Sequence, residues 1–294
     1  MLRFEEAELY RVLPEPLRNA LKSLPLTRRS ELEEIRLRQG YSAAALIRGR
    51  EELLQDRWQN ILVTNQMLEN LLARATDYSA YSAAEYLRQG FVTIAGGHRI
   101  GFCGQAVLER GKLQCLRDLT SASVRIARAV PDYALQLRPY LSPELPSLLI
   151  IGPPGAGKTS LLRELVRLLS DEQAQRVSLI DERFEIAACS QGRAVFPVGQ
   201  RTDILSGCPK EQGISLMLRT MSPQWIVVDE VTAPEDIQAM QHAGYCGVRL
   251  AATAHAADRR DLQSRALYRQ LVAAQIFTKL ITIRRDRKIT VEDL

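Results

Sequence analysis

The sequence is short of the features that mark exported, membrane-spanning and metal-stabilised proteins. No apolar run approaches the ~20 residues that a helix needs to cross a bilayer. The first residues, MLRFEEAELY, do not follow the basic-then-apolar layout of a secretory signal. The five cysteines are scattered, odd in number and without CxxC pairing, which argues against a zinc site or a disulfide framework. We therefore expect a cytoplasmic protein with buried free thiols in a reducing compartment.

What the chain does contain is an ordinary globular composition. Of its 294 residues, 46% are hydrophobic and 25% are charged, which is enough for a substantial core and for two domains. The net charge of +5 suits an acidic partner such as nucleic acid or an anionic membrane surface. A mild excess of this size is more often solvated surface, so composition alone does not identify a partner.

One stretch, LLIIGPPGAGKT at 148–159, organises the rest of the chain. A short buried-strand pattern leads into a glycine-rich turn with the spacing Gly-x-x-x-x-Gly-Lys-Thr, and a helical pattern, SLLRELVRLL, follows directly. The order is strand, phosphate loop, helix. The alternative is a glycine-rich turn that happens to precede a lysine, but chance would rarely supply the strand and the helix as well. The stretch therefore predicts a nucleotide-phosphate site.

The residue types of this loop match the chemistry of phosphate binding. Gly155 and Gly157 permit backbone conformations closed to residues with a Cβ, so successive N–H groups can face one concavity at a helix N-terminus. Lys158 can reach the β- and γ-phosphates, and the Thr159 hydroxyl can bind Mg²⁺. We take the base to be adenine because the guanine-reading motif Asn-Lys-x-Asp is absent. The predicted nucleotide-binding residues are Gly152, Pro153, Pro154, Gly155, Ala156, Gly157, Lys158, Thr159 and Ser160.

Apolar strand candidates alternate with helical segments from this stretch onward. The candidates lie at 148–151, 177–180, 226–228, 248–253 and 277–283. Such alternation predicts a mostly parallel sheet covered on both faces, with ligands at the carboxyl ends of the strands.

The part of the chain before the phosphate loop mixes helix and strand patterns. Helical patterns occupy 8–24, with an interruption at Pro14 and Pro16, and also 65–74 and 83–88. Alternation of period two predicts a hairpin over 33–47 and strands at 91–94, 98–107 and 123–128. Prolines at 131, 139, 143 and 146 predict a linker near 135–147. We expect an α+β domain over 1–138 and a P-loop domain over 139–294.

Two acids follow the apolar run of 225–228. In a phosphate-loop enzyme the first acid at such a strand end completes the Mg²⁺ shell, and the next polarises the attacking water. We therefore predict Asp229 and Thr159 as the Mg²⁺ residues and Glu230 as the general base.

Further polar residues follow two other predicted strands. Asp181 and Glu182 would hold the water or the metal from its other side, or would only pair charges at the surface. His255 would sense the γ-phosphate and relay hydrolysis to the next helix, or would be an ordinary hydrogen-bonded histidine. The predicted catalytic group is Glu230, Lys158, His255 and Glu182.

Motifs across nearly the whole chain resemble one family, the stage III sporulation protein AA family. They are EEIRLR at 33–38, TIAGGHR at 93–99, PPGAGKT at 153–159, DER at 181–183, RTD at 201–203, GCPK at 207–210, MSP at 221–223 and TAH at 253–255. That family is similar to the type II and type IV secretion ATPases. The resemblance implies a RecA-type P-loop core with a mostly parallel sheet, preceded by a smaller α+β N-terminal domain. Two departures are Val231-Thr232-Ala233, where the family commonly has isoleucine, glycine and often arginine, and Ala256 in place of glycine.

The resemblance also implies a function. It predicts a cytosolic Mg²⁺-dependent ATPase, a ring of six subunits, that works with membrane proteins of a channel between mother cell and forespore during endospore formation. Ring ATPases often need an arginine from a second domain or a neighbouring subunit to offset transition-state charge. The candidates are Arg99, Arg125, Arg128 and Arg201. Two alternatives stay open, a DNA-translocating or DNA-remodelling motor and an ATP-gated assembly scaffold with little turnover, although a nucleic-acid partner is the less favoured reading.

Overall fold

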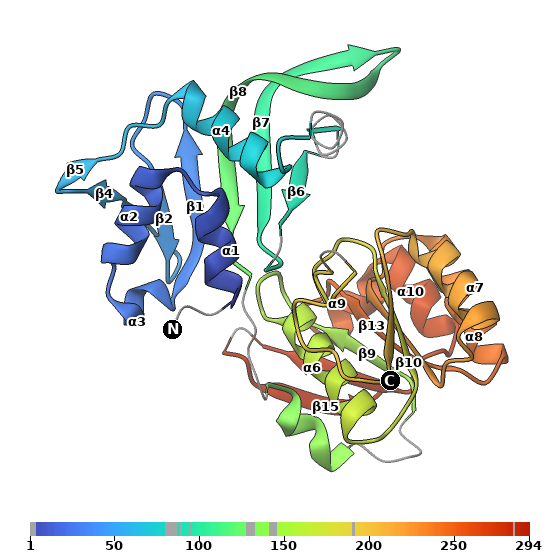
Figure 1. Ribbon diagram of the computed structural model, residues 1–294. Helices are drawn as coiled ribbons and strands as arrows, with labels where there is room; N and C mark the ends of the chain where they lie inside the picture. Colours follow the sequence, from blue (N-terminus) through green and yellow to red (C-terminus); the bar gives the residue numbers. More distant parts are fainter. Residues whose placement is uncertain are drawn as a thin grey trace. The chain divides into compact units, whose positions relative to one another are not determined.

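The chain forms two compact units, Met1–Arg128 and Ala129–Leu294 (Figure 1). The computed structural model describes residues 4–79, 87–88, 90–94, 96–127, 133–140, 146–189, 192–284 and 286–294. Most of the helix predicted over 83–88, and Arg128, lie outside the described residues. The predicted domain boundary after residue 138 falls inside a 3₁₀ helix of the second unit, η1 (Tyr133–Tyr140), and it stays a prediction because compactness alone does not show which segments fold independently.

The first unit is an antiparallel sheet with helices packed on it. The strand order is β3-β2-β1-β8-β7-β6, and every neighbouring pair is antiparallel. The strands are β1 (Leu32–Arg38), β2 (Ala44–Ile47), β3 (Arg50–Leu53), β6 (Phe91–Thr93), β7 (Arg99–Glu109) and β8 (Lys112–Arg125). The helices are α1 (Phe4–Val12), α2 (Glu15–Ser23), α3 (Leu26–Arg29) and α4 (Asn65–Ala75), and a small separate hairpin joins β4 (Gln55–Asp56) to β5 (Gln59–Asn60).

Local sequence explains the helix breaks of this unit. Pro14 is the N-cap of α2 and Pro16 lies in its first turn, where a missing N–H costs nothing, so the predicted interruption of the first helical pattern is confirmed. Thr64 caps α4 by accepting the N–H of Met67. Apolar side chains of α1, α2 and α4 form one buried cluster with the inner face of the sheet.

The second unit is built on a seven-stranded sheet. Its strand order is β11-β10-β12-β13-β9-β14-β15, and all neighbours are parallel except β14 and β15, so the predicted mostly parallel sheet is confirmed. The strands are β9 (Leu148–Ile151), β10 (Val177–Asp181), β11 (Thr202–Ser206), β12 (Trp225–Glu230), β13 (Arg249–Ala254), β14 (Lys279–Ile283) and β15 (Ile289–Asp293). The helices are α6 (Lys158–Asp171), α7 (Lys210–Thr220), α8 (Pro234–Tyr245), α9 (Arg259–Ser264) and α10 (Ala266–Ala273).

Successive residues of the buried strands face opposite sides of this sheet. Leu148 and Ile150 pack with α6 and η1 in one apolar cluster. Leu149 and Ile151 pack with α7, α8 and α10 in another. The sheet is therefore covered on both faces. All four residues of β9 are buried, as expected for a parallel strand with no face exposed to solvent.

The segment predicted as a linker, 135–147, overlaps η1, whose Leu137 is buried in the second unit's core. The structure corrects one sequence expectation. The cysteines are not all buried, since Cys103 and Cys246 are exposed. Within the described part of the chain, no helix is long and apolar enough to cross a membrane.

Candidate functional site

The glycine-rich loop joins β9 to α6 in the backbone shape that its sequence predicts. Gly155 and Gly157 have left-handed φ values of 76° and 101°, and Gly157 is the N-cap of α6. A Cβ on Gly152 would lie 2.7 Å from the carbonyl oxygen of Ile283 on the neighbouring strand β14. A Cβ on Gly157 would lie 3.3 Å from the ring of Tyr133. The glycines therefore serve the loop's conformation and its close packing, and they leave the N-terminus of α6 open to an anion.

Parallel pairing brings three strand ends together at this loop. Ala254 of β13 pairs with Ile151 of β9, so the next residues, His255 and Gly152, are neighbours at the carboxyl edge. Glu230 of β12 pairs with Thr253 on the other side of β13. Residues far apart in sequence thus meet where ligands of parallel sheets bind.

Lys158 occupies the centre of this arrangement. Its side chain is buried, and its Nζ donates hydrogen bonds to the carbonyl oxygens of Gly152 at 2.8 Å and Pro153 at 3.2 Å. Nζ also lies 2.8 Å from His255 Nδ1. These three contacts use the three hydrogens of the ammonium group. Burial lowers the pKa of Lys158, while the charges of Glu230 and Asp229 oppose that effect.

His255 links the lysine to the predicted base. Its Nε2 lies 3.0 Å from Glu230 Oε2. Burial, followed by the charge of Lys158, lowers the pKa of His255 and favours the neutral ring. In the neutral ring, Nδ1 accepts from Lys158 and the Nε2 hydrogen points to the Glu230 carboxylate. The result is a continuous hydrogen-bonded chain of Lys158, His255 and Glu230.

Asp229 is the most perturbed acid near the loop. Burial, together with the nearby charges of Glu185 and Asp181, raises its pKa to about 7. Within the described part of the chain, Asp229 has no hydrogen bond to Thr159, which lies in the first turn of α6. The described residues also hold no group of three or more His, Cys, Asp or Glu that could bind a metal. Mg²⁺ bound with a nucleotide does not need one, because it takes one or two protein oxygens and completes its shell with phosphates and water.

Asp181 has a structural task that the sequence did not reveal. Its buried carboxylate accepts four backbone N–H groups, from Glu185 and Ile186 on Oδ1 and from Ala187 and Ala188 on Oδ2. These contacts occupy the four lone-pair positions of a carboxylate. Asp181 therefore fixes the loop that follows β10.

A buried arginine holds the same loop from α6. Arg163 donates from its guanidinium to the carbonyl oxygens of Ile186 and Glu185, each at 2.6 Å, and stacks 3.7 Å from the ring centre of Phe196. Sequence reasoning missed Arg163. The available signal was a charged residue on the apolar face of LLRELV, a position that needs a specific partner.

Glu182 forms an ion pair with Lys210, a nearly buried lysine at the start of α7. This pairing is the alternative that the sequence left open for Glu182. Its predicted part in catalysis stays a prediction.

The candidate arginines are distributed over both units. In the first unit, Arg99 stacks 3.6 Å from the ring centre of Phe91 and pairs across the sheet with exposed Arg125. In the second unit, Arg201 precedes β11 and donates to the Ser170 carbonyl oxygen. It therefore lies at the amino edge of the parallel sheet, opposite the phosphate loop of its own subunit. Arg183, which was not predicted, follows β10 at the carboxyl edge, and its charge lowers the pKa of both Asp229 and His255.

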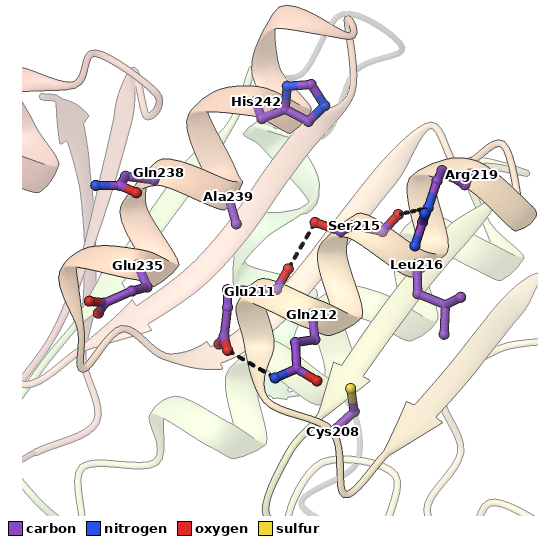
Figure 2. A pocket seen from close by; sticks show the side chains of 10 residues that line it. All are labelled: Cys208, Glu211, Gln212, Ser215, Leu216, Arg219, Glu235, Gln238, Ala239 and His242. Atoms are coloured by element: carbon purple, nitrogen blue, oxygen red, sulfur yellow. Dashed lines mark hydrogen bonds between the residues drawn. The ribbon is translucent and has the colours of Figure 1, made fainter.

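An open hollow lies elsewhere, between α7 and α8 (Figure 2). Glu211 and Glu235, from the first turns of the two helices, lie toward one end, and Arg219 and His242 lie toward the other (Figure 2). None of the predicted site residues lines it. The loop and the three strand ends, rather than this hollow, bring the chemically matched groups together.

Comparison with known proteins shows the family of the chain and proteins of similar fold. The chain is 37% identical over 285 residues to stage III sporulation protein AA of Bacillus subtilis (strain 168), covering 95% of this chain and 91% of that protein. Its fold is similar to the X-ray structure of the Legionella pneumophila ATPase DotB, with a TM-score of 0.56, 16% identity and coverage of 89% of this chain and 75% of that one. It is also similar to the crystal structure of the pilus retraction motor PilT with bound ADP, with a TM-score of 0.57, 15% identity and coverage of 96% and 78%. The family described as sporulation stage III, protein AA, matches residues 4–291. The chain therefore belongs to the stage III sporulation protein AA family, and its fold is similar to those of DotB and PilT.

Proposed function

We propose that this protein is a Mg²⁺-dependent ATPase that powers or assembles a secretion-like channel during endospore formation. The observation that carries the proposal is the hydrogen-bonded chain of Lys158, His255 and Glu230 at the mouth of the phosphate loop. Support also comes from the similar structures, one of which is described as an ATPase and the other as a motor with bound ADP.

Each residue of the site has a distinct task in this proposal. The loop N–H groups and Lys158 bind the phosphates, and Lys158 exchanges its bonds to the Gly152 and Pro153 carbonyl oxygens for phosphate oxygens. Thr159 and Asp229 would hold Mg²⁺, which supplies charge neutralisation when bound. Glu230 accepts a proton from the attacking water.

His255 connects the first of these tasks to the last. Its Nδ1 contacts the lysine that binds phosphate, and its Nε2 donates to the carboxylate that activates water. When phosphate draws Lys158 away, His255 loses one partner and keeps the other. The state of the phosphate site is thereby communicated to Glu230.

The proposal also includes assembly of several subunits into a ring. Arg183 is the arginine that the structure places at the carboxyl edge, and of the predicted set only Arg201 belongs to the second unit, at the amino edge. We propose that a neighbouring subunit supplies one, and that the working form is a homo-oligomer, a hexamer by analogy with ring ATPases, associated with membrane channel proteins.

The test is phosphate release per protomer against protein concentration, with Mg²⁺-ATP, for the parent, Lys158→Ala and Glu230→Gln. We expect a specific rate that rises with concentration, is lost in Lys158→Ala and falls by about 10²-fold or more in Glu230→Gln, which retains ATP binding. A near-zero rate in the parent despite ATP binding would favour the scaffold. A rate that rises on adding DNA and binding that weakens steeply with salt would favour the DNA motor.

A further inference from the structure

The loop that follows β10 carries an arginine that is available to a ligand. Arg183 is exposed, and among the residues that the structure describes its guanidinium has no hydrogen bond or ion pair. The two acids before it are already engaged. Glu182 pairs with Lys210, and the Asp181 carboxylate accepts four backbone N–H groups. The charge of Arg183 is therefore not needed to neutralise either acid.

The backbone around Arg183 is held in place. Phe184 has a left-handed φ of 57°, and its N–H donates to the Asp181 carbonyl oxygen at 3.3 Å, which closes a tight turn around Glu182 and Arg183. The Phe184 ring packs closely on Gly207, where a Cβ would lie 2.9 Å from it. A fixed backbone limits the positions that the Arg183 side chain can reach, so less freedom is lost when it binds a ligand.

Strand pairing places this turn beside the acids of the phosphate site. Ile180 of β10 pairs with Val228 of β12 in parallel register. The two strands therefore reach the carboxyl edge together, with Asp181 next to Asp229. Arg183 lies two residues beyond Asp181. It thus belongs to the edge of the sheet where ligands of parallel sheets bind.

The charge of Arg183 acts on two groups of that site. Burial is the main influence on the pKa of Asp229 and of His255, and the positive charge of Arg183 lowers both. His255 in turn contacts the Nζ of Lys158 at the phosphate loop. In the strand order, β12 and β13 lie between β10 and β9. Arg183 and Lys158 therefore lie on opposite sides of the strand ends that carry Asp229 and His255.

We propose that the Arg183 guanidinium binds the γ-phosphate of ATP in its own subunit, from the side opposite Lys158. Lys158 and the loop N–H groups approach the phosphates from β9, and Arg183 adds positive charge from β10, where hydrolysis develops negative charge. A guanidinium suits this task because its planar group donates two parallel hydrogen bonds to phosphate oxygens. ADP lacks the γ-phosphate, so the contact makes the site selective for ATP. This inference rests on the proposed function, and it adds an arginine in cis to the one that a neighbouring subunit is proposed to supply.

The first test compares nucleotide affinities by isothermal titration calorimetry. Mg²⁺ with a non-hydrolysable ATP analogue, or with ADP, is titrated into the full-length parent, Arg183→Ala and Arg176→Ala. Arg176 is a matched control, because it is exposed at the other end of the same strand, where it donates to the Ser222 carbonyl oxygen. We expect Arg183→Ala to bind the analogue at least about ten-fold more weakly than the parent and ADP equally well. Arg176→Ala should match the parent with both nucleotides.

Turnover and mixing test whether Arg183 acts in its own subunit. Phosphate release by Arg183→Ala should fall by about 10²-fold or more, and Arg183→Lys, which keeps the charge, should recover part of the loss. Lys158→Ala has an intact Arg183 beside a defective phosphate loop. An equimolar mixture of Lys158→Ala and Arg183→Ala should therefore release phosphate no faster than the two variants do separately. Recovery of activity on mixing would assign Arg183 to a neighbour's site and overturn the proposal.

The binding experiment also separates this inference from the proposed function. A parent that binds neither nucleotide would overturn both. A parent that hydrolyses ATP, together with an Arg183→Ala variant that keeps the parent's ratio of ATP-analogue to ADP affinity, would overturn the role of Arg183 and leave the ATPase standing. The ratio of affinities needs no turnover, so it decides the role of Arg183 even in a parent that binds ATP without hydrolysing it.

Discussion

The buried carboxyl group of Asp229 makes the stability of the folded protein depend on pH. Its pKa of about 7 lies well above that of an ordinary aspartate, because burial and the neighbouring acids disfavour its charged form. The folded protein therefore binds this proton more tightly than the unfolded chain does. The stability that this proton contributes is fully present at low pH, and it is lost as pH rises through the pKa of Asp229 in the folded protein.

This linkage predicts a pH dependence that one substitution removes. Without Mg²⁺ or nucleotide, the free energy of unfolding of the parent should fall by about 2 kcal/mol more between pH 5.5 and pH 8 than that of Asp229→Asn. Urea denaturation at the two pH values measures the difference. Parallel pH profiles for the two proteins would show that Asp229 does not hold the proton.

Asp181 acts through hydrogen bonds rather than through its proton. Asn in its place offers one acceptor oxygen instead of two, and its NH₂ group would face backbone donors. We expect Asp181→Asn to destabilise the protein by about 2–4 kcal/mol, measured by urea denaturation. The control is Asp203→Asn on the adjacent strand β11, an exposed carboxylate, which should change stability by less than about 0.5 kcal/mol. Equal effects of the two substitutions would contradict this role.

At the scale of single elements, the sequence predicted those whose signals are local. The strand, loop and helix at 148–171 follow from a continuous apolar run, fixed glycine spacing and a helical pattern. Strands β11 and β15 were not predicted, because TDILS and ITVED form the two edges of the sheet, are only partly buried and lack a clear apolar run. The helix η1 was hidden by the prolines around it.

In the candidate site, too, features with a local sequence signal could be predicted and contacts between elements could not. The positions of the loop residues and of the strand-end acids could be predicted, because each depends on its own strand. Contacts between elements could not be predicted, because a hydrogen bond such as that of Arg163 to Glu185, or an ion pair such as Lys210 with Glu182, depends on the packing of α6 and α7.

Arg163 offers a prediction at this scale, since it connects α6 to the loop after β10. Lysine keeps the charge but lacks the planar group that reaches two carbonyl oxygens and stacks on Phe196. In Arg163→Lys, amide hydrogen exchange over 184–189 should become at least about ten-fold faster. Arg167→Lys, one turn along the same helix and paired with Glu164, should leave that exchange unchanged. Faster exchange in both variants would indicate a general loss of helix packing.

At the scale of the whole molecule, apolar burial is divided between the two units. One buried cluster consists only of residues from the first unit, and the two clusters on the faces of the parallel sheet consist only of residues from the second. The phosphate loop, the strand-end acids and His255 all belong to the second unit. A nucleotide that binds this site therefore stabilises one of the two cores directly.

Ligand linkage turns this division into a calorimetric prediction. We expect two unfolding transitions, and Mg²⁺ with a non-hydrolysable ATP analogue at 100 times its Kd should stabilise the second unit by about 2.7 kcal/mol and leave the first unchanged. Lys158→Ala should show both transitions without the ligand-induced shift, which separates binding from general salt effects. A single transition that moves as a whole would mean that the units unfold together, and the boundary predicted from the prolines would then not separate independent domains.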